Sequence, residues 1–122
     1  MAAIILIVDD DPHLREGFAR LLAEEGYDAR VAASAEEGLH LMRETMPDCV
    51  IMDVRMPGMD GLEALRRMKA AAPALPVVLL TGHASLGVAV EGMDLGAFDY
   101  MLKPVAINEL ILKMEEAARA AS

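Results

Sequence analysis

Short apolar segments alternate with longer amphipathic segments along the whole chain of 122 residues. Three of the short segments are almost continuous in Val, Ile, Leu and Met, which is typical of strands covered on both faces. The predicted strands are Ile4–Val8, Asp28–Ala32, Cys49–Asp53, Val77–Thr81 and Phe98–Leu102. Because strands and helices alternate, the pattern favours a parallel sheet built from βαβ units.

The segments between the predicted strands carry apolar residues at helical spacing. These stripes, which we interpret as core-facing, are Leu14, Phe18, Leu21 and Leu22; Ala35, Leu39, Met42 and Met46; Leu62, Leu65, Met68 and Ala72; and Ile107, Leu110, Ile111, Met114 and Ala118. The stretch 84–95 contains Gly87 and Gly92. Each glycine costs a helix interior about 1 kcal/mol relative to alanine, so we expect the least stable helix there.

Polar residues mark where several of these helices begin and end. Asp11, Ser34 and Asp60 each precede a predicted helix and are suited to the N-cap position. Pro12 fits the first helical position, and Gly26 fits the position just after the end of the first helix.

The composition limits both the size and the partners of the protein. A chain of this length with 55% hydrophobic residues predicts one domain, residues 1–122, around one core. Its formal net charge of −9 disfavours direct contact with nucleic acid. No apolar run is long enough for a membrane span, and no secretory signal is recognisable, so we expect a cytoplasmic protein without membrane contact. The single cysteine, Cys49, lies in an apolar stretch and is interpreted as a buried, inert thiol.

Chemically distinctive residues follow the predicted strands. Right-handed crossovers leave few topologies, and both common doubly wound orders bind ligands at the carboxyl ends of the strands. The residues found at those ends are Asp9, Asp10, Asp11, Asp53, Thr81 and Lys103.

Clustered carboxylates require a compensating cation. Two carboxylates about 4 Å apart repel by about 4 kcal/mol at an effective dielectric constant near 20. Oxygen ligands without histidine or cysteine at zinc spacing favour Mg²⁺. Because one aspartate of the triplet is also needed as an N-cap, we assign that role to Asp11 and leave Asp9 and Asp10 for the metal.

Four sequence segments together resemble a known family. The segments IVDDDP, MDVRMPGMDG, LLTGH and FDYMLKP occur in this order. The first contains Asp9 and Asp10, and the other three contain Asp53, Thr81 and Lys103 in turn. The chain closely resembles the receiver domain of bacterial two-component response regulators. The resemblance implies a doubly wound α/β fold of the flavodoxin-like type, with five parallel strands in the order 2-1-3-4-5 and helices on both faces.

The resemblance also implies a role for each site residue. Asp53 is the expected phospho-acceptor, which receives a phosphoryl group from a sensor histidine kinase. Asp10, Asp53 and the main-chain carbonyl of Arg55 are the expected Mg²⁺ ligands, with Asp9 acting directly or through water. Lys103 and the Thr81 hydroxyl are expected to neutralise the phosphoryl oxygens.

A further pair is expected to transmit the signal. In receivers the hydroxyl at the position of Thr81 moves towards the phosphoryl group, and the aromatic ring at the position of Tyr100 turns inward. The surface of the fourth helix, fifth strand and fifth helix then changes, and an output domain, a partner protein or a second copy of the chain binds there. Without the resemblance, Tyr100 reads as an ordinary amphipathic strand residue. The resemblance also implies a cis peptide bond between Lys103 and Pro104.

The remaining expectations concern the histidines and the wider protein. His13 and His40 are interpreted as solvated helix residues, whereas His83 lies close enough to Thr81 to affect water access to a phosphoryl group. MPGMDG and GAFDYMLKP are similar to segments of receivers attached to transcriptional activators. The expected protein is a signalling domain that catalyses only its own phosphorylation and dephosphorylation.

Two alternatives use the same sheet. A Mg²⁺-dependent phosphohydrolase of the haloacid-dehalogenase kind also has an aspartate nucleophile, but it carries a second acid two residues later, where this chain has Arg55. A flavodoxin-like cofactor binder needs a phosphate-cradling loop after the first strand, where Asp9, Asp10 and Asp11 would repel the phosphate. Both alternatives are disfavoured.

Overall fold

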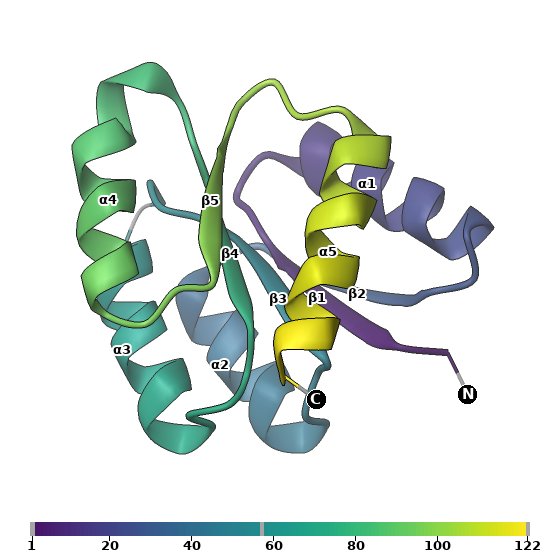
Figure 1. The fold of residues 1–122 in the computed structure, drawn as a ribbon, viewed down its shortest axis with the longest axis horizontal. Coiled ribbons are helices and arrows are strands. Elements are labelled where there is room, and N and C mark those ends of the chain that lie inside the picture. The colour runs from purple at the N-terminus through teal and green to yellow at the C-terminus, as the bar shows by residue number, and fades with distance from the viewer. Residues whose placement is uncertain (1, 57, 122) are drawn as a thin grey trace.

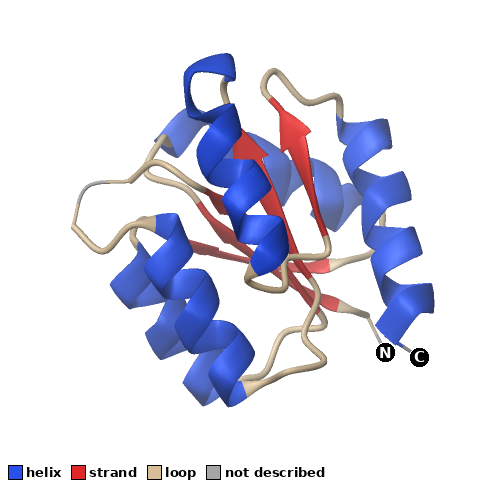
Figure 2. Ribbon diagram, turned by 60° about the vertical axis from the view of Figure 1, so that its left-hand side comes forward, coloured by secondary structure: helices blue, strands red, loops and turns tan. Residues whose placement is uncertain are grey.

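The computed structural model describes residues 2–56 and 58–121, and its centre is a parallel sheet. Within the described residues the sheet has five strands in the order β2-β1-β3-β4-β5. Figure 2 shows the strands in red among the blue helices. The strands are β1 (Ile4–Val8), β2 (Asp28–Ala32), β3 (Cys49–Asp53), β4 (Val77–Thr81) and β5 (Asp99–Leu102). All adjacent pairs are parallel, which confirms the strand order that the sequence resemblance implied.

Helices cover both faces of the sheet. They are α1 (Pro12–Glu24), α2 (Ala35–Glu44), α3 (Gly61–Ala71), α4 (Leu86–Asp94) and α5 (Ile107–Ala121), with a 3₁₀ turn, η1 (His83–Ser85), before α4. In Figure 1, α1 and α5 lie on one side of the sheet, and α2, α3 and α4 lie on the other. This arrangement explains why the central strands are apolar at nearly every position.

Alternate residues of each strand supply two halves of the core. Leu6 and Val8 pack with side chains of α2, α3 and α4, whereas Ile5 and Ile7 pack with side chains of α1 and α5. All four are at most 2% exposed. Because successive strand residues point to opposite faces, one apolar run serves both halves.

The N-caps lie where the sequence predicted them. Asp11 accepts hydrogen bonds from the backbone N–H groups of His13 and Leu14, at 3.0 and 3.5 Å. Ser34 and Asp60 make the equivalent contact to the third residue of α2 and α3, at 3.1 and 2.9 Å. Each side chain satisfies a helix N–H that has no partner within the helix.

Three sequence expectations about single residues were wrong. Met46 was expected in the core but is 51% exposed, because α2 ends at Glu44 and Thr45 is extended. On α5 it is Ala117, 1% exposed, that faces the core, and Ala118 is exposed. Strand β5 begins at Asp99, one residue later than expected.

The two glycines of α4 have different surroundings. A Cβ atom on Gly87 would meet nothing within 4 Å, whereas one on Gly92 would overlap Cδ1 of Leu79 in β4. Gly92 therefore allows α4 to approach the sheet closely. Gly92 thus has a packing role that the sequence did not reveal, and the low stability of α4 stays a prediction.

Two expectations about the interior and the surface can be compared with the structure. Cys49 is 4% exposed, and burial raises the pKa of its thiol from 9.0 to about 12, which agrees with an inert cysteine. Among the described residues, none of the helices combines the length and apolarity that crossing a bilayer requires.

Candidate functional site

Three carboxylates meet where β1 and β3 end. These strands are neighbours, so Asp9, which follows β1, lies beside Asp53, the last residue of β3. One oxygen atom from each of Asp9, Asp10 and Asp53 lies within 4.8 Å of the others. Asp9 is fully buried and Asp53 is 7% exposed, while Asp10 is exposed. The structure therefore brings together the three aspartates that the sequence assigned to a metal.

Lys103 reaches this cluster from the edge of the sheet. Its ammonium nitrogen lies 3.1 Å from Oδ2 of Asp9 and 2.9 Å from Oδ2 of Asp53. Its backbone N–H donates to the carbonyl of Thr81 at 2.7 Å, which continues the pairing of β4 and β5. The peptide bond between Lys103 and Pro104 is cis, as the resemblance implied.

The charges in the cluster are only partly compensated. Burial raises the pKa of Asp9, although the Asp11 N–H and the Lys103 ammonium both favour its charged form. Burial disfavours the charge of Lys103, but hydrogen bonds to Asp53 and Asp9 outweigh this effect, so the pKa of Lys103 is raised. One ammonium group contacts two of the three carboxylates, so the cluster keeps a net negative charge that favours binding of a further cation.

Asp9 is held in place at every polar atom of its backbone and side chain. Its N–H donates to the carbonyl of Ala32 at 3.1 Å, and its carbonyl accepts from Nη1 of Arg15 at 2.9 Å. Oδ1 accepts from the N–H of Asp11 at 2.9 Å, and Oδ2 faces Lys103. Sequence reasoning missed Arg15, whose position one helical turn after Asp11 was the available signal.

The loop after β3 organises the carboxylate of Asp53. The backbone N–H of Arg55 donates to Oδ1 of Asp53 at 3.0 Å. The Arg55 side chain donates from Nε to the hydroxyl of Ser85 at 2.8 Å. Ser85, 7% exposed at the end of η1, was not singled out from the sequence.

The remaining residues that the sequence analysis singled out have different environments. Thr81 is fully buried at the end of β4, and its hydroxyl donates to the carbonyl of Gly82 at 2.9 Å. Tyr100 is half-buried and packs against the half of the core under α2, α3 and α4. His13, His40 and His83 are exposed.

The fold and the cluster together define an α/β domain with an acidic site at the carboxyl ends of its strands. The model of the response regulator receiver domain family matches residues 5–115 of this chain. The chain therefore belongs to the response regulator receiver domain family. Membership supports a role in two-component signalling in which the domain accepts a phosphoryl group.

Individual relatives agree with this assignment. The chain is 40% identical over its full length to the response regulator MprA of a Mycobacterium species, strain KMS, and spans 53% of that protein. It is 40% identical over 97% of its length to the regulatory protein AtoC of Escherichia coli K12 and spans 26% of that protein. The chain thus spans about half of the length of MprA and about a quarter of the length of AtoC.

A solved structure shows the same fold. The crystal structure of a response regulator receiver domain protein from Clostridium thermocellum superposes with a TM-score of 0.92 at 35% identity. The superposition covers 97% of this chain and 95% of that one.

Proposed function

We propose that this receiver accepts a phosphoryl group on Asp53 from a phosphohistidine of a sensor histidine kinase, in a reaction that depends on Mg²⁺. The observation that carries the proposal is the surroundings of the Asp53 carboxylate. It lies 2.9 Å from the Lys103 ammonium and shares a 4.8 Å cluster with Asp9 and Asp10. Such surroundings suit a nucleophile that becomes a dianionic acyl phosphate, the mixed anhydride of a carboxylic acid and phosphoric acid.

The chemical step is a substitution at phosphorus. A carboxylate oxygen of Asp53 forms an O–P bond while the P–N bond to the donor imidazole breaks, and the electron pair of that bond stays with the imidazole nitrogen. The transition state is loose, so the protein contributes position and charge compensation rather than covalent chemistry of its own.

The donor set around Asp53 fits Mg²⁺. Asp9, Asp10, Asp53 and the main-chain carbonyl of Arg55 offer only oxygen atoms, which this hard cation prefers. When bound, Mg²⁺ neutralises charge on the acceptor and phosphoryl oxygens. Asp9, fixed by Arg15 and Asp11, contributes either directly or through water.

Lys103 and Thr81 act on the phosphoryl group once it is attached. The Lys103 ammonium already contacts the acceptor carboxylate, so it is placed to form an ion pair with a phosphoryl oxygen. The Thr81 hydroxyl exchanges its bond to Gly82 for a bond to another phosphoryl oxygen. Tyr100 then turns inward into the space that the threonine leaves.

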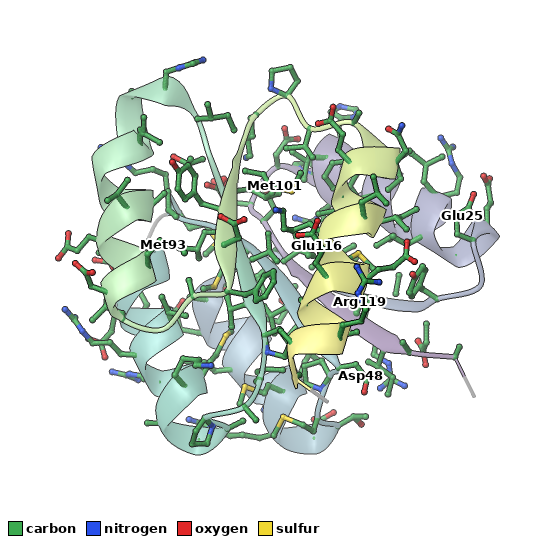
Figure 3. The ribbon with its side chains drawn as sticks, viewed as in Figure 1. Glu25, Asp48, Met93, Met101, Glu116 and Arg119 are labelled. Atoms are coloured by element: carbon green, nitrogen blue, oxygen red, sulfur yellow. The ribbon has the colours of Figure 1, made fainter. Side chains whose placement is uncertain are left out.

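The signal leaves through the surface of α4, β5 and α5. Four large apolar side chains are exposed there: Val90, Met93, Leu102 and Leu112, between 37% and 60%. Figure 3 labels Met93 on α4. An exposed apolar surface of this kind fits a protein partner, which is an output domain, a separate partner or a second copy of the chain.

Residues 1–122 act as one receiver domain in the cytoplasm, and their partners are proteins rather than membranes or nucleic acid. The net charge of −9 supports the last point, since it repels phosphate backbones. The output is transcriptional regulation, carried by another protein segment. The domain is a switch and turns over no external substrate.

Phosphorylation with a small donor tests this function. Incubation with acetyl phosphate and Mg²⁺ should add one phosphate that hydroxylamine removes, because an acyl phosphate is labile to that nucleophile. Asp53→Asn should abolish uptake, whereas Asp94→Asn, an exposed aspartate of α4, should not. If Asp53→Asn took up as much phosphate as the wild type, the assignment of Asp53 as the acceptor would be refuted. If EDTA left phosphate uptake unchanged, the proposed dependence on Mg²⁺ would be refuted. Steady turnover of a generic phosphate ester would instead favour a phosphohydrolase.

A further inference from the structure

The Arg55 side chain links the acceptor loop to the start of α4. Its backbone N–H contacts Oδ1 of Asp53, and its Nε contacts Oγ of Ser85. Strands β3 and β4 are adjacent, so the Arg55–Ser85 contact spans the ends of the strands that carry Asp53 and Thr81. The residue therefore touches both the proposed phosphorylation site and the turn that precedes the proposed output helix.

Most of the donor capacity of this guanidinium is unused. A guanidinium has five N–H donors, and Ser85 receives one of them. Within residues 2–56 and 58–121, neither Nη1 nor Nη2 of Arg55 has a hydrogen-bond or ion-pair partner, and the residue is exposed. The planar pair of donors matches the geometry of phosphate oxygens.

Ser85 has a second possible partner as well. It occupies the N-cap position of α4, where a serine hydroxyl usually accepts from a backbone N–H of the first helical turn. Here the hydroxyl makes no such bond, and the backbone of Ser85 lies at φ −112° and ψ 13° rather than in the extended region that caps prefer. The contact with Arg55 thus takes the place of the helix cap.

We propose that the Arg55 guanidinium binds the phosphoryl group on Asp53, and that the phosphoryl group and Ser85 compete for it. This inference rests on the proposed phosphorylation of Asp53. A bond from guanidinium to phosphate adds the attraction between two opposite charges, which a bond to the neutral Ser85 hydroxyl lacks, so phosphorylation draws Arg55 away from Ser85. The buried hydroxyl of Ser85 then loses its partner and caps α4 as the Ser85 backbone turns from ψ 13° to the extended region, which couples the phosphate to α4 without Thr81 or Tyr100.

Affinity for beryllofluoride, a stable tetrahedral stand-in for a phosphoryl group on a carboxylate, tests the competition in the presence of Mg²⁺. Arg55→Gln should weaken binding about tenfold, because a charge-assisted contact is lost. Ser85→Ala should tighten binding about two- to fivefold, because the competing bond from Arg55 to the Ser85 hydroxyl is gone. In the double variant, Ser85→Ala should have no further effect.

The opposite signs separate this role from a structural one. If the Arg55–Ser85 bond only held the loops together, both single variants would weaken binding, and that result would overturn the proposal. Arg119→Gln, which makes the same charge change near the C-terminal end of α5 (Figure 3), should bind like the wild type. If Arg119→Gln lost as much beryllofluoride affinity as Arg55→Gln, the effect of Arg55 would be one of net charge only, and this result would also overturn the proposal.

Hydrogen exchange provides the second readout. On addition of beryllofluoride, the amide of Val88, in the first turn of α4, should exchange more slowly in the wild type but not in Ser85→Ala. If the Val88 amide of the wild type exchanged at the same rate with and without saturating beryllofluoride, the capping step would be refuted. If the wild type bound no beryllofluoride and took up no phosphate, the proposed function itself would fail; normal uptake with no Arg55→Gln effect would refute only this inference.

Discussion

The Lys103 ammonium and the Asp53 carboxylate are 2.9 Å apart although 50 residues separate them in the sequence. The same ammonium is 3.1 Å from the fully buried Asp9. Lys103 is therefore the cation that compensates this cluster within the protein itself. Removing a charge that compensates a buried carboxylate leaves that carboxylate to neutralise or to destabilise the fold.

Lys103→Met should lower the free energy of unfolding in EDTA by about 1–3 kcal/mol, the cost of leaving a buried polar group without its partner. Methionine keeps most of the apolar stem, so the lost charge dominates. Saturating Mg²⁺ should restore more stability to the variant than to the wild type, since the metal replaces the missing charge and binds only the folded state. Urea unfolding with EDTA or Mg²⁺ measures both effects.

Lys113→Met is the matched control for this experiment. Lys113 also pairs with two carboxylates, Asp99 at 2.8 Å and Glu116 at 3.2 Å, but lies outside the aspartate cluster. Its substitution should leave the response to Mg²⁺ unchanged. An identical Mg²⁺ response in Lys103→Met and wild type would contradict the assignment of Lys103 as the compensating charge.

Asp11 caps α1 and is not expected to bind the metal. Asp11→Ala should lower the free energy of unfolding by about 1 kcal/mol, because two helix N–H groups lose their acceptor. Asp11→Ser should recover most of that loss, since serine is also a good N-cap. Calorimetric titration should give all three proteins a similar Mg²⁺ affinity; a tenfold loss confined to Asp11→Ala would make the side chain a ligand.

Gly92 and Gly87 offer a matched pair on α4. Gly92→Ala should destabilise the protein by about 1–3 kcal/mol, because the new methyl group overlaps Cδ1 of the fully buried Leu79, which has to shift within a packed core. Gly87→Ala should be neutral or stabilise by up to about 1 kcal/mol, because the site is open and alanine favours a helix. Thermal unfolding should show a lower Tm for Gly92→Ala and an unchanged or higher Tm for Gly87→Ala. Equal destabilisation of both variants would contradict the close approach of α4 to β4 at Gly92.

The sequence predicted the elements well because their signals are local. Apolar runs, helical stripes and capping residues each act over a few positions, so four of the five expected strands have the bounds observed. The prediction that Met46 lies in the core was wrong because the apolar stripe continues in the sequence beyond the end of α2, where the Thr45 backbone is extended. The strand ends also located Asp9, Asp10, Asp53, Thr81 and Lys103, since parallel strands collect their carboxyl ends at one edge of the sheet.

Contacts between loops were not predictable in this way. The bond from Arg55 to Ser85 joins residues 30 positions apart, and neither residue belongs to a periodic pattern. The bond from Arg15 to the carbonyl of Asp9 depends on the direction in which a long side chain turns. Such contacts follow from the packed arrangement of the elements, which spacing along the chain does not specify.

Cys49 provides a test of burial through pH. Burial raises the pKa of its thiol from 9.0 to about 12, so the folded chain holds the thiol proton more tightly than the unfolded chain does. The stability that this group contributes is complete below about pH 9 and is lost as pH rises towards 12. The loss should be about 1.4 kcal/mol for each pH unit above about 9.

Comparison with Cys49→Ala isolates this contribution from the other groups that titrate in alkali. The difference in free energy of unfolding between wild type and variant should shrink as pH rises from 8 to about 10.5, since only the wild type has the thiol. Native Cys49 should also react with iodoacetamide far more slowly than the urea-unfolded chain, because the thiolate is the reactive form. A constant stability difference across this range, together with rapid labelling of the native protein, would show that the thiol ionises as freely in the fold as in water.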